Sequence, residues 1–281
     1  MGLTLNWFQS LIIGFFSGIA DVLPVSAQAH KAVLLTLFGV AQEPPLLRIF
    51  IHIATFCALY FSCQQQIMRM IRQKQLARIP KQRRKRPVDL RILMDVRLLI
   101  TMIIPVLLGF FFYQKATSLY HRLSWIALFL VINAVVLYLP NFLPSGNKDS
   151  RSLSRFEAAL MGLGGACSVL PGISSVGTIC SIGGVCGAER SYIVDISLLM
   201  QMAITAVLIF FDFISLFTVG FGIAGFGGLI ACLLAGAAAF VGTYYGIKIM
   251  RAMAVNIGFS IFAYYSFGLA VVAFVLYLSA V

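Results

Sequence analysis

A small set of polar and ionisable side chains interrupts the long apolar segments of this sequence. An ionisable side chain inside such a segment is costly in a membrane and usually faces the protein interior or a cavity. Carboxylate and imidazole groups there could transfer protons, and a guanidinium group could bind a phosphate. The candidates for catalysis or binding are Asp21, Ser26, His30, Arg48, His52, Ser174, Ser175, Thr178 and Asp195.

The first three candidates surround the dipeptide Leu23-Pro24. Proline interrupts a helix, and a carboxylate just before such a break in lipid needs a partner, so Asp21 is predicted to be functional. His30 is interpreted either as a ligand or acid/base group, or as a buried polar side chain with satisfied hydrogen bonds. Helix ends beside Ser26 and Ser174 would present N–H groups that suit a phosphate, although the small residues there also favour helix packing.

Arg48 and Asp195 are 147 residues apart, as are the prolines of two Leu-Pro dipeptides, Pro24 and Pro171. One interpretation is that Arg48 and Asp195 face each other as a structural ion pair, with an attraction of roughly 4 kcal/mol at an effective dielectric constant of 20. The alternative is that Arg48 contacts a phosphate. Asp212 stands alone in an apolar run and is interpreted as structural or interfacial.

The elements that would position these residues are membrane helices. Hydrophobic residues make up 60% of the 281 positions and charged residues only 11%, whereas about 25% of the residues of soluble domains are charged. Segments of about 20 apolar residues recur along the chain, which is the length that crosses a bilayer. This composition excludes a soluble enzyme.

Four apolar segments are too short to span a bilayer comfortably, and they form two pairs: 7–23 with 25–40, and 156–170 with 173–187. Each pair is broken by a Leu-Pro dipeptide, which favours a re-entrant helical hairpin. The residues around the two breaks resemble each other, which indicates an internal repeat.

Lysine and arginine residues concentrate in the polar loop 67–97. The positive-inside rule places this loop in the cytoplasm, and binding of nucleic acid is not expected because no aromatic residues are interleaved with the charge. With this orientation the first hairpin enters the membrane from outside and the second from inside, so that their tips meet near the midplane, where transporters bind their substrates.

We therefore predict an all-α polytopic membrane protein with about six transmembrane helices and two re-entrant hairpins arranged as inverted repeats. A single membrane domain would cover residues 1–281, with one repeat at about 7–114 and the other at about 156–279.

Two motifs carry a resemblance to a known family. The stretch Leu23-Pro24-Val25-Ser26, with an acid at position 21 and His30, and the later stretch Pro171-Gly172-Ile173-Ser174-Ser175, resemble the undecaprenyl-diphosphate phosphatase family of the bacitracin-resistance type. The resemblance implies an enzyme of the bacterial cytoplasmic membrane that removes a phosphate from the C55 polyprenyl diphosphate lipid. It also implies dependence on Mg²⁺ or Ca²⁺, with Asp21 as the metal ligand. Membrane lipids are the expected partners, together with a second copy of the chain in a homodimer.

The chain departs from the family motifs at several positions. Ser17 replaces the first of two glutamates, Asp21 replaces the second, and Ser175 occupies the position of an arginine. Ser26, His30 and Ser174 match the motifs. Further replacements are Ala27 for serine, Ala29 for glycine, Val176 for serine, Arg48 and Asp195 for glutamates, and His52 for glutamine.

Two hypotheses of different classes follow. The first is a divergent lipid-diphosphate phosphatase with Asp21, Ser26 and His30 as catalytic residues and Arg48 or Lys31 in place of the missing arginine. In that case Arg48, His52, Ser174, Ser175, Thr178 and Asp195 would bind the substrate. The second is a catalytically degenerate relative that binds or translocates polyprenyl phosphate. A transporter of small ions on the same scaffold is a third alternative.

Overall fold

The computed structural model describes residues 6–40, 43–84, 86–120, 122–223, 225–256 and 259–280. Within these ranges it contains helices and no named strand, which confirms the predicted all-α class. Six helices are long and apolar enough to cross a membrane, also as predicted. They are Pro45–Arg78, Leu90–Phe110, Leu123–Phe142, Arg190–Thr218, Gly225–Met253 and Ser260–Ser279.

The first short helix pair consists of α1 (Trp7–Val22) and α2 (Ala27–Leu37). Asn6 begins α1 because its side chain accepts a hydrogen bond from the amide of Phe8, while the side chain of Gln9 accepts one from the amide of Asn6. The chain leaves the helix at Leu23, one residue before the proline, and Ser26 then caps α2. The predicted break therefore lies at the Leu-Pro dipeptide.

The second pair consists of α7 (Arg155–Ala166), a short 3₁₀ turn η3 (Cys167–Val169) and α8 (Ser175–Val185). Gly172 in the turn has a φ angle of 114°, a conformation that residues with a side chain rarely adopt. A Cβ atom at this position would also lie 2.9 Å from the carbonyl oxygen of Ile126. The turn after Pro171 thus depends on glycine.

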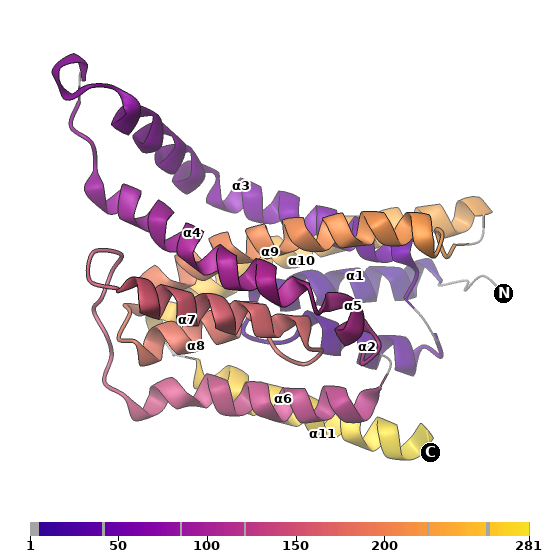
Figure 1. The fold of residues 1–281 in the computed structure, drawn as a ribbon. Helices are drawn as coiled ribbons and strands as arrows, with labels where there is room; N and C mark the ends of the chain where they lie inside the picture. The colour runs from indigo at the N-terminus through magenta and orange to yellow at the C-terminus, as the bar shows by residue number, and fades with distance from the viewer. Residues whose placement is uncertain are drawn as a thin grey trace.

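The two pairs open toward opposite ends of the molecule, and their turns meet in its interior (Figure 1). The amide of Gly172 donates a hydrogen bond to Oγ of Ser26 over 3.1 Å, and the hydroxyl of Ser174 donates to the carbonyl oxygen of Leu23 over 3.1 Å. The predicted contact between the two tips is confirmed by these hydrogen bonds. The ancestral repeat itself stays an interpretation of the sequence.

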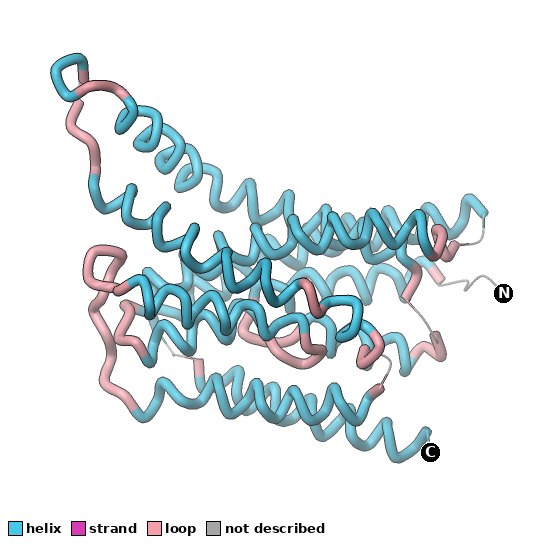
Figure 2. Tube along the Cα trace, viewed as in Figure 1, coloured by secondary structure: helices cyan, strands magenta, loops and turns pink. Residues whose placement is uncertain are grey.

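Long helices surround the two pairs (Figures 1 and 2). Helix α3 (Pro45–Arg78) packs on α9 (Arg190–Thr218) and α10 (Gly225–Asn256), α4 (Leu90–Phe110) packs on α7, and α6 (Leu123–Tyr138) packs on α11 (Ser260–Ala280). Three shorter elements complete the fold: η1 (Lys81–Arg83), α5 (Tyr113–Thr117) and η2 (Leu139–Phe142).

Helix α1 lies unusually close to α10. A Cβ atom added to Gly18 would lie 2.2 Å from the carbonyl oxygen of Ala239, and one added to Gly14 would lie 2.1 Å from that of Ala235. Small residues allow such close approach, which favours association of helices in lipid. This contact fixes the depth of the first tip relative to α10.

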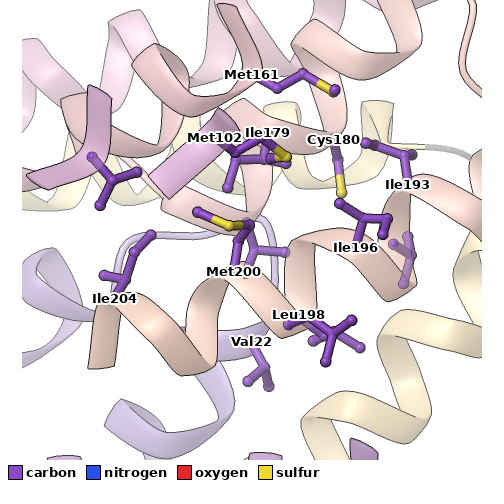
Figure 3. Close-up of a cluster of buried hydrophobic side chains, with 14 of the residues drawn as sticks. Val22, Met102, Met161, Ile179, Cys180, Ile193, Ile196, Leu198, Met200 and Ile204 are labelled. Carbon is purple, nitrogen blue, oxygen red and sulfur yellow. The ribbon is translucent and has the colours of Figure 1, made fainter. Parts of the chain in front are cut away.

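The largest apolar cluster lies between α4, α7, α8 and α9 (Figure 3). It contains Met102, Met161, Ile179, Ile193 and Met200, all of which are almost completely buried. Because these side chains hold α8 against α9, they also fix the position of the turn that precedes α8.

Helix α3 has 34 residues and is therefore about 51 Å long, well beyond the roughly 30 Å of a bilayer core. Its last turns extend away from the bundle together with the start of α4 (Figure 1). The exposed basic residues of the loop 67–97 gather on this extension.

Candidate functional site

The hydroxyls of the two hairpin tips hold the tips in place. Oγ of Ser26 accepts hydrogen bonds from the amide of Ala29 at 3.3 Å and from that of Gly172 at 3.1 Å, and Ser26 is 1% exposed. Ser174 accepts from the amide of Gly177 and donates to Leu23. Both lone pairs of the Ser26 oxygen are thus engaged by backbone donors, so the main contribution of this side chain is to the turn.

Ser175 and Thr178 occupy different positions along the first turn of α8. The Ser175 hydroxyl donates to Oε1 of Gln201, and both residues line a small cavity of about 30 Å³. The Thr178 hydroxyl lies 2.8 Å from the carbonyl oxygen of Gly164 and does not line this cavity. Of the two, Ser175 is therefore the one placed to contact a ligand.

Asp21 faces the same small cavity as Ser174, Ser175 and Gln201. The hydroxyl of Thr55 donates a hydrogen bond to Oδ2 of Asp21 over a long 3.4 Å. A carboxylate held by one long hydrogen bond keeps most of its acceptor capacity for a ligand or a water molecule. The prediction that Asp21 lies at the meeting point of the hairpins agrees with this placement.

A much larger cavity, of about 580 Å³, adjoins the small one because Gln28 lines both. Its walls combine charged and hydroxyl side chains with apolar ones. The lining comes from α2, α3, α5, α9 and the loops that follow α2 and α5, and it includes Gln28, Lys31, Leu35, Glu43, Arg48, Tyr113, Tyr120, Ile214 and Ser215.

Two cationic side chains line this larger cavity. Lys31, on α2, forms an ion pair with Glu43 at 3.1 Å. Arg48, on α3, pairs through Nε with Oδ1 of Asp212 at 2.5 Å and donates from Nη2 to the hydroxyl of Ser215 at 3.1 Å. The cations are therefore held in place by acids, and an anionic ligand would share them with those acids.

The predicted pairing of Arg48 with Asp195 is wrong. Asp195 pairs with Arg251 at 3.0 Å, and it lies 17 residues before Asp212 on α9, which is about 25 Å along the helix axis. An equal offset along the sequence therefore does not by itself bring Arg48 and Asp195 together in space. Asp195 accordingly lines neither of the two cavities.

The two candidate histidines, His30 and His52, also lie outside the linings of both cavities. Nδ1 of His30 donates to the carbonyl oxygen of Ser26 at 2.7 Å, and its Nε2 accepts from the hydroxyl of Tyr265 at 2.7 Å. His52 donates from Nδ1 to Oδ2 of Asp212 at 2.5 Å. Both ring nitrogens of His30 are thus bonded to protein groups, which is the alternative kept open for this residue.

Sequence reasoning did not identify the partners of Asp212 and did not include Tyr113 among the candidates. Asp212 has no exposed surface and joins Arg48 to His52, which agrees with its structural interpretation. A lone acid in an apolar run was the signal that could have identified it. Tyr113 gave no such signal, because tyrosine is common near membrane interfaces.

The donors around Asp21 do not form a metal site made of protein alone. Within the described ranges, no group of three or more His, Cys, Asp or Glu side chains converges on one point. Asp21 is the one carboxylate among the residues lining the small cavity, beside hydroxyl and amide oxygens. Mg²⁺ and Ca²⁺ take six or more oxygen ligands, so this donor set does not fit a resident ion.

Comparisons with known proteins agree with this architecture. The model of the family described as "Bacitracin resistance protein BacA" matches residues 10–272. A protein of Methanobrevibacter smithii named undecaprenyl-diphosphatase is 31% identical over 275 residues, covering 95% of this chain and 96% of the relative. Proteins with the same name from Methanococcus maripaludis (26% identical, 92% and 96% covered) and Carboxydothermus hydrogenoformans (25% identical, 97% and 98% covered) also match. With a match over nearly its whole length, and with two helix pairs that meet at a polar centre, this chain belongs to the bacitracin resistance protein BacA family.

Proposed function

We propose that this protein hydrolyses a polyprenyl diphosphate lipid, of the C55 undecaprenyl class, to the monophosphate. The observation that carries the proposal is the arrangement of the two adjoining cavities: Lys31 and Arg48 line the larger one, and Asp21 lines the smaller one. The names of the relatives, which are undecaprenyl-diphosphatases, support the same substrate class.

The larger cavity suits an amphiphilic ligand. Apolar side chains such as Leu35 and Ile214 line it together with the two cations. A diphosphate head group could lie against Lys31 and Arg48 while the first isoprene units follow the apolar wall. Cations beside the non-bridging oxygens stabilise the charge that a transferring phosphoryl group spreads over them.

The chemistry assigned to the chain is direct attack by water. Asp21 accepts a proton from a water molecule while the oxygen of that water attacks the terminal phosphorus. The bond from this phosphorus to the bridging oxygen then breaks. The products are inorganic phosphate and the polyprenyl monophosphate. Ser26 and His30, predicted as catalytic, are assigned here to positioning of the first tip because protein groups occupy their polar atoms.

No step is assigned to a divalent cation. If Mg²⁺ or Ca²⁺ takes part, phosphate oxygens must complete its ligand sphere beside Asp21. We therefore expect no saturable binding of Mg²⁺ below millimolar concentration without lipid. Isothermal titration of the purified protein with Mg²⁺ measures this, and a micromolar site in the absence of lipid would contradict it.

We further propose that the protein lies in the cytoplasmic membrane of a bacterium with the basic loop 67–97 inside. The larger cavity then opens outside, because Arg48 lies near the start of α3 and the basic loop follows its far end (Figure 1). A membrane-impermeant maleimide should label Ser118→Cys in intact cells and should not label Gln82→Cys, with the unaltered chain as control. The reverse pattern would overturn the orientation. The predicted homodimer is tested separately, by measuring the molecular mass of the protein in detergent.

The decisive experiment is release of phosphate from undecaprenyl diphosphate by the purified full chain. We expect turnover by the unaltered protein and a loss of at least about 100-fold in Arg48→Ala, since the variant lacks one of the two cations. Binding of undecaprenyl monophosphate without any turnover would instead favour carriage or translocation of the lipid. Full activity in Arg48→Ala would overturn the role given to this side chain.

A further inference from the structure

The hydroxyl of Tyr113 has no hydrogen-bond partner among the residues that the structure describes. Tyr113 begins α5, lines the larger cavity, and is only 4% exposed. A buried hydroxyl without a partner costs free energy, because it has lost the hydrogen bonds that it makes to water. Such a group in the wall of a cavity is typical of a site that a ligand completes.

The ring of Tyr113 is fixed by its aromatic neighbours. Its centroid lies 5.6 Å from that of Phe110, with planes 30° apart, and 5.0 Å from that of Phe211. Aromatic contacts of this kind limit the orientations available to a ring. The position of the phenolic oxygen is therefore set before any ligand binds.

Other tyrosines with partly buried hydrogen bonds find protein acceptors. Tyr120, in the same cavity, donates to the carbonyl oxygen of Val169 at 3.0 Å. Tyr192 donates to Oδ1 of Asp95 at 3.0 Å, and Tyr265 donates to His30 at 2.7 Å. Tyr113 differs from these three in having its donor free in the part of the chain that is described.

We propose that Tyr113 is a substrate-binding residue whose phenol donates a hydrogen bond to a phosphate oxygen of the lipid head group. The inference rests on the proposed function and names one more contact of the same site. Lys31 and Arg48 line the same cavity and would draw an anion into it. A phenol donates one hydrogen bond and matches the non-bridging oxygen of a phosphate, whereas an uncharged prenyl alcohol would offer only a weaker acceptor.

The test compares two Tyr→Phe variants of the full chain in detergent. Geranylgeranyl diphosphate is the probe, inorganic diphosphate is the probe without a tail, and dissociation constants are measured by isothermal titration. Tyr113→Phe should bind geranylgeranyl diphosphate at least roughly tenfold more weakly than the unaltered chain. Its melting temperature without ligand should be unchanged or higher, because the unpaired hydroxyl has been removed.

Tyr192→Phe is the matched control. It also removes one phenolic oxygen, but from a partly buried hydrogen bond with Asp95 and outside the larger cavity. It should lower the melting temperature without ligand and leave the dissociation constant unchanged. A purely structural role for Tyr113 would give the pattern of this control instead and would overturn the inference.

The outcomes also separate this inference from the proposed function. If the unaltered chain binds the diphosphate without hydrolysing it, and Tyr113→Phe binds it more weakly, the results support the contact of Tyr113 and contradict the proposed activity. If the unaltered chain hydrolyses the diphosphate and Tyr113→Phe binds it with unchanged affinity, the results support the activity and contradict the contact of Tyr113. If inorganic diphosphate binds as tightly as geranylgeranyl diphosphate, with the same loss in Tyr113→Phe, the phenol recognises phosphate from either source, which supports the contact.

Discussion

Arg48 and Asp212 form an ion pair that joins α3 to α9 at the wall of the larger cavity. Nε lies 2.5 Å from Oδ1, the Asp212 side chain has no exposed surface, and that of Arg48 is 15% exposed. The other carboxylate oxygen of Asp212 accepts from His52. Arg48 thus has a partner on its buried side and an accessible side toward the cavity, which is the arrangement expected of a guanidinium that must hold its position and still meet a ligand.

Replacement of Asp212 should destabilise the protein strongly. In Asp212→Asn the buried guanidinium of Arg48 loses its counter-charge, and breaking a buried pair in this way costs about 3–5 kcal/mol. Asp195→Asn is the control, because its pair with Arg251 is about 40% exposed on both sides and should contribute no more than about 1 kcal/mol. Thermal unfolding in detergent measures both, and equal losses would mean that Arg48 does not depend on Asp212.

Asp21→Asn should separate turnover from binding. The amide keeps the size of the side chain but cannot accept a proton, so phosphate release should fall by at least about 100-fold while the affinity for geranylgeranyl diphosphate is retained. Asp89→Asn, at the exposed start of α4, is the control, since asparagine also caps helices. Retained turnover in Asp21→Asn would exclude the role of proton acceptor.

Ser26→Ala should reduce stability more than it reduces chemistry. The variant loses a helix cap and leaves the amide of Gly172 without its acceptor, which together cost about 2–3 kcal/mol. Ser154→Ala is the control. It removes a helix cap of α7 that makes no contact with the other hairpin, and it should cost about 1 kcal/mol. Phosphate release measured at a temperature where Ser26→Ala is folded should persist. Complete loss there would restore Ser26 as a catalytic residue.

Gly18→Ala should disturb the contact between α1 and α10. The new methyl group would lie 2.2 Å from the carbonyl oxygen of Ala239, so the helices must move apart, at a cost of about 1–3 kcal/mol. Asp21 follows one helical turn later, so turnover should fall as well. Gly268→Ala is the matched control in α11, where a Cβ atom meets nothing within 4 Å. Equal melting temperatures for the two variants would show that the close approach is not needed.

The sequence was informative where local chemistry decides the structure. The Leu-Pro dipeptides end α1 and η3, and serine caps follow both, so the breaks and their meeting point could be predicted from the chain. Side-chain partners that depend on how the helices pack could not be predicted from the chain. Arg48 was assigned to Asp195 because symmetry of sequence was taken for proximity, whereas the true partner, Asp212, is selected by how α3 lies on α9.

Tyr113 shows the same limit. Its type and position in the sequence do not distinguish it from Tyr120. Tyr120 has a bonded hydroxyl because the second hairpin supplies the carbonyl oxygen of Val169 as its acceptor. Roles of this kind become visible when the distances between distant segments are known.

The paired hydrogen bonds between the two tips have a consequence for biosynthesis. The serine of each turn bonds to the backbone of the other, so a ribosome that has delivered only the first 150 residues has made a hairpin without its counterpart. In lipid no water replaces the hydrogen-bond partners that the second turn provides, so the first turn stays incomplete until the second is inserted. Assembly of the polar centre is therefore a late step, completed only after α7 and α8 have entered the membrane beside helices already in place.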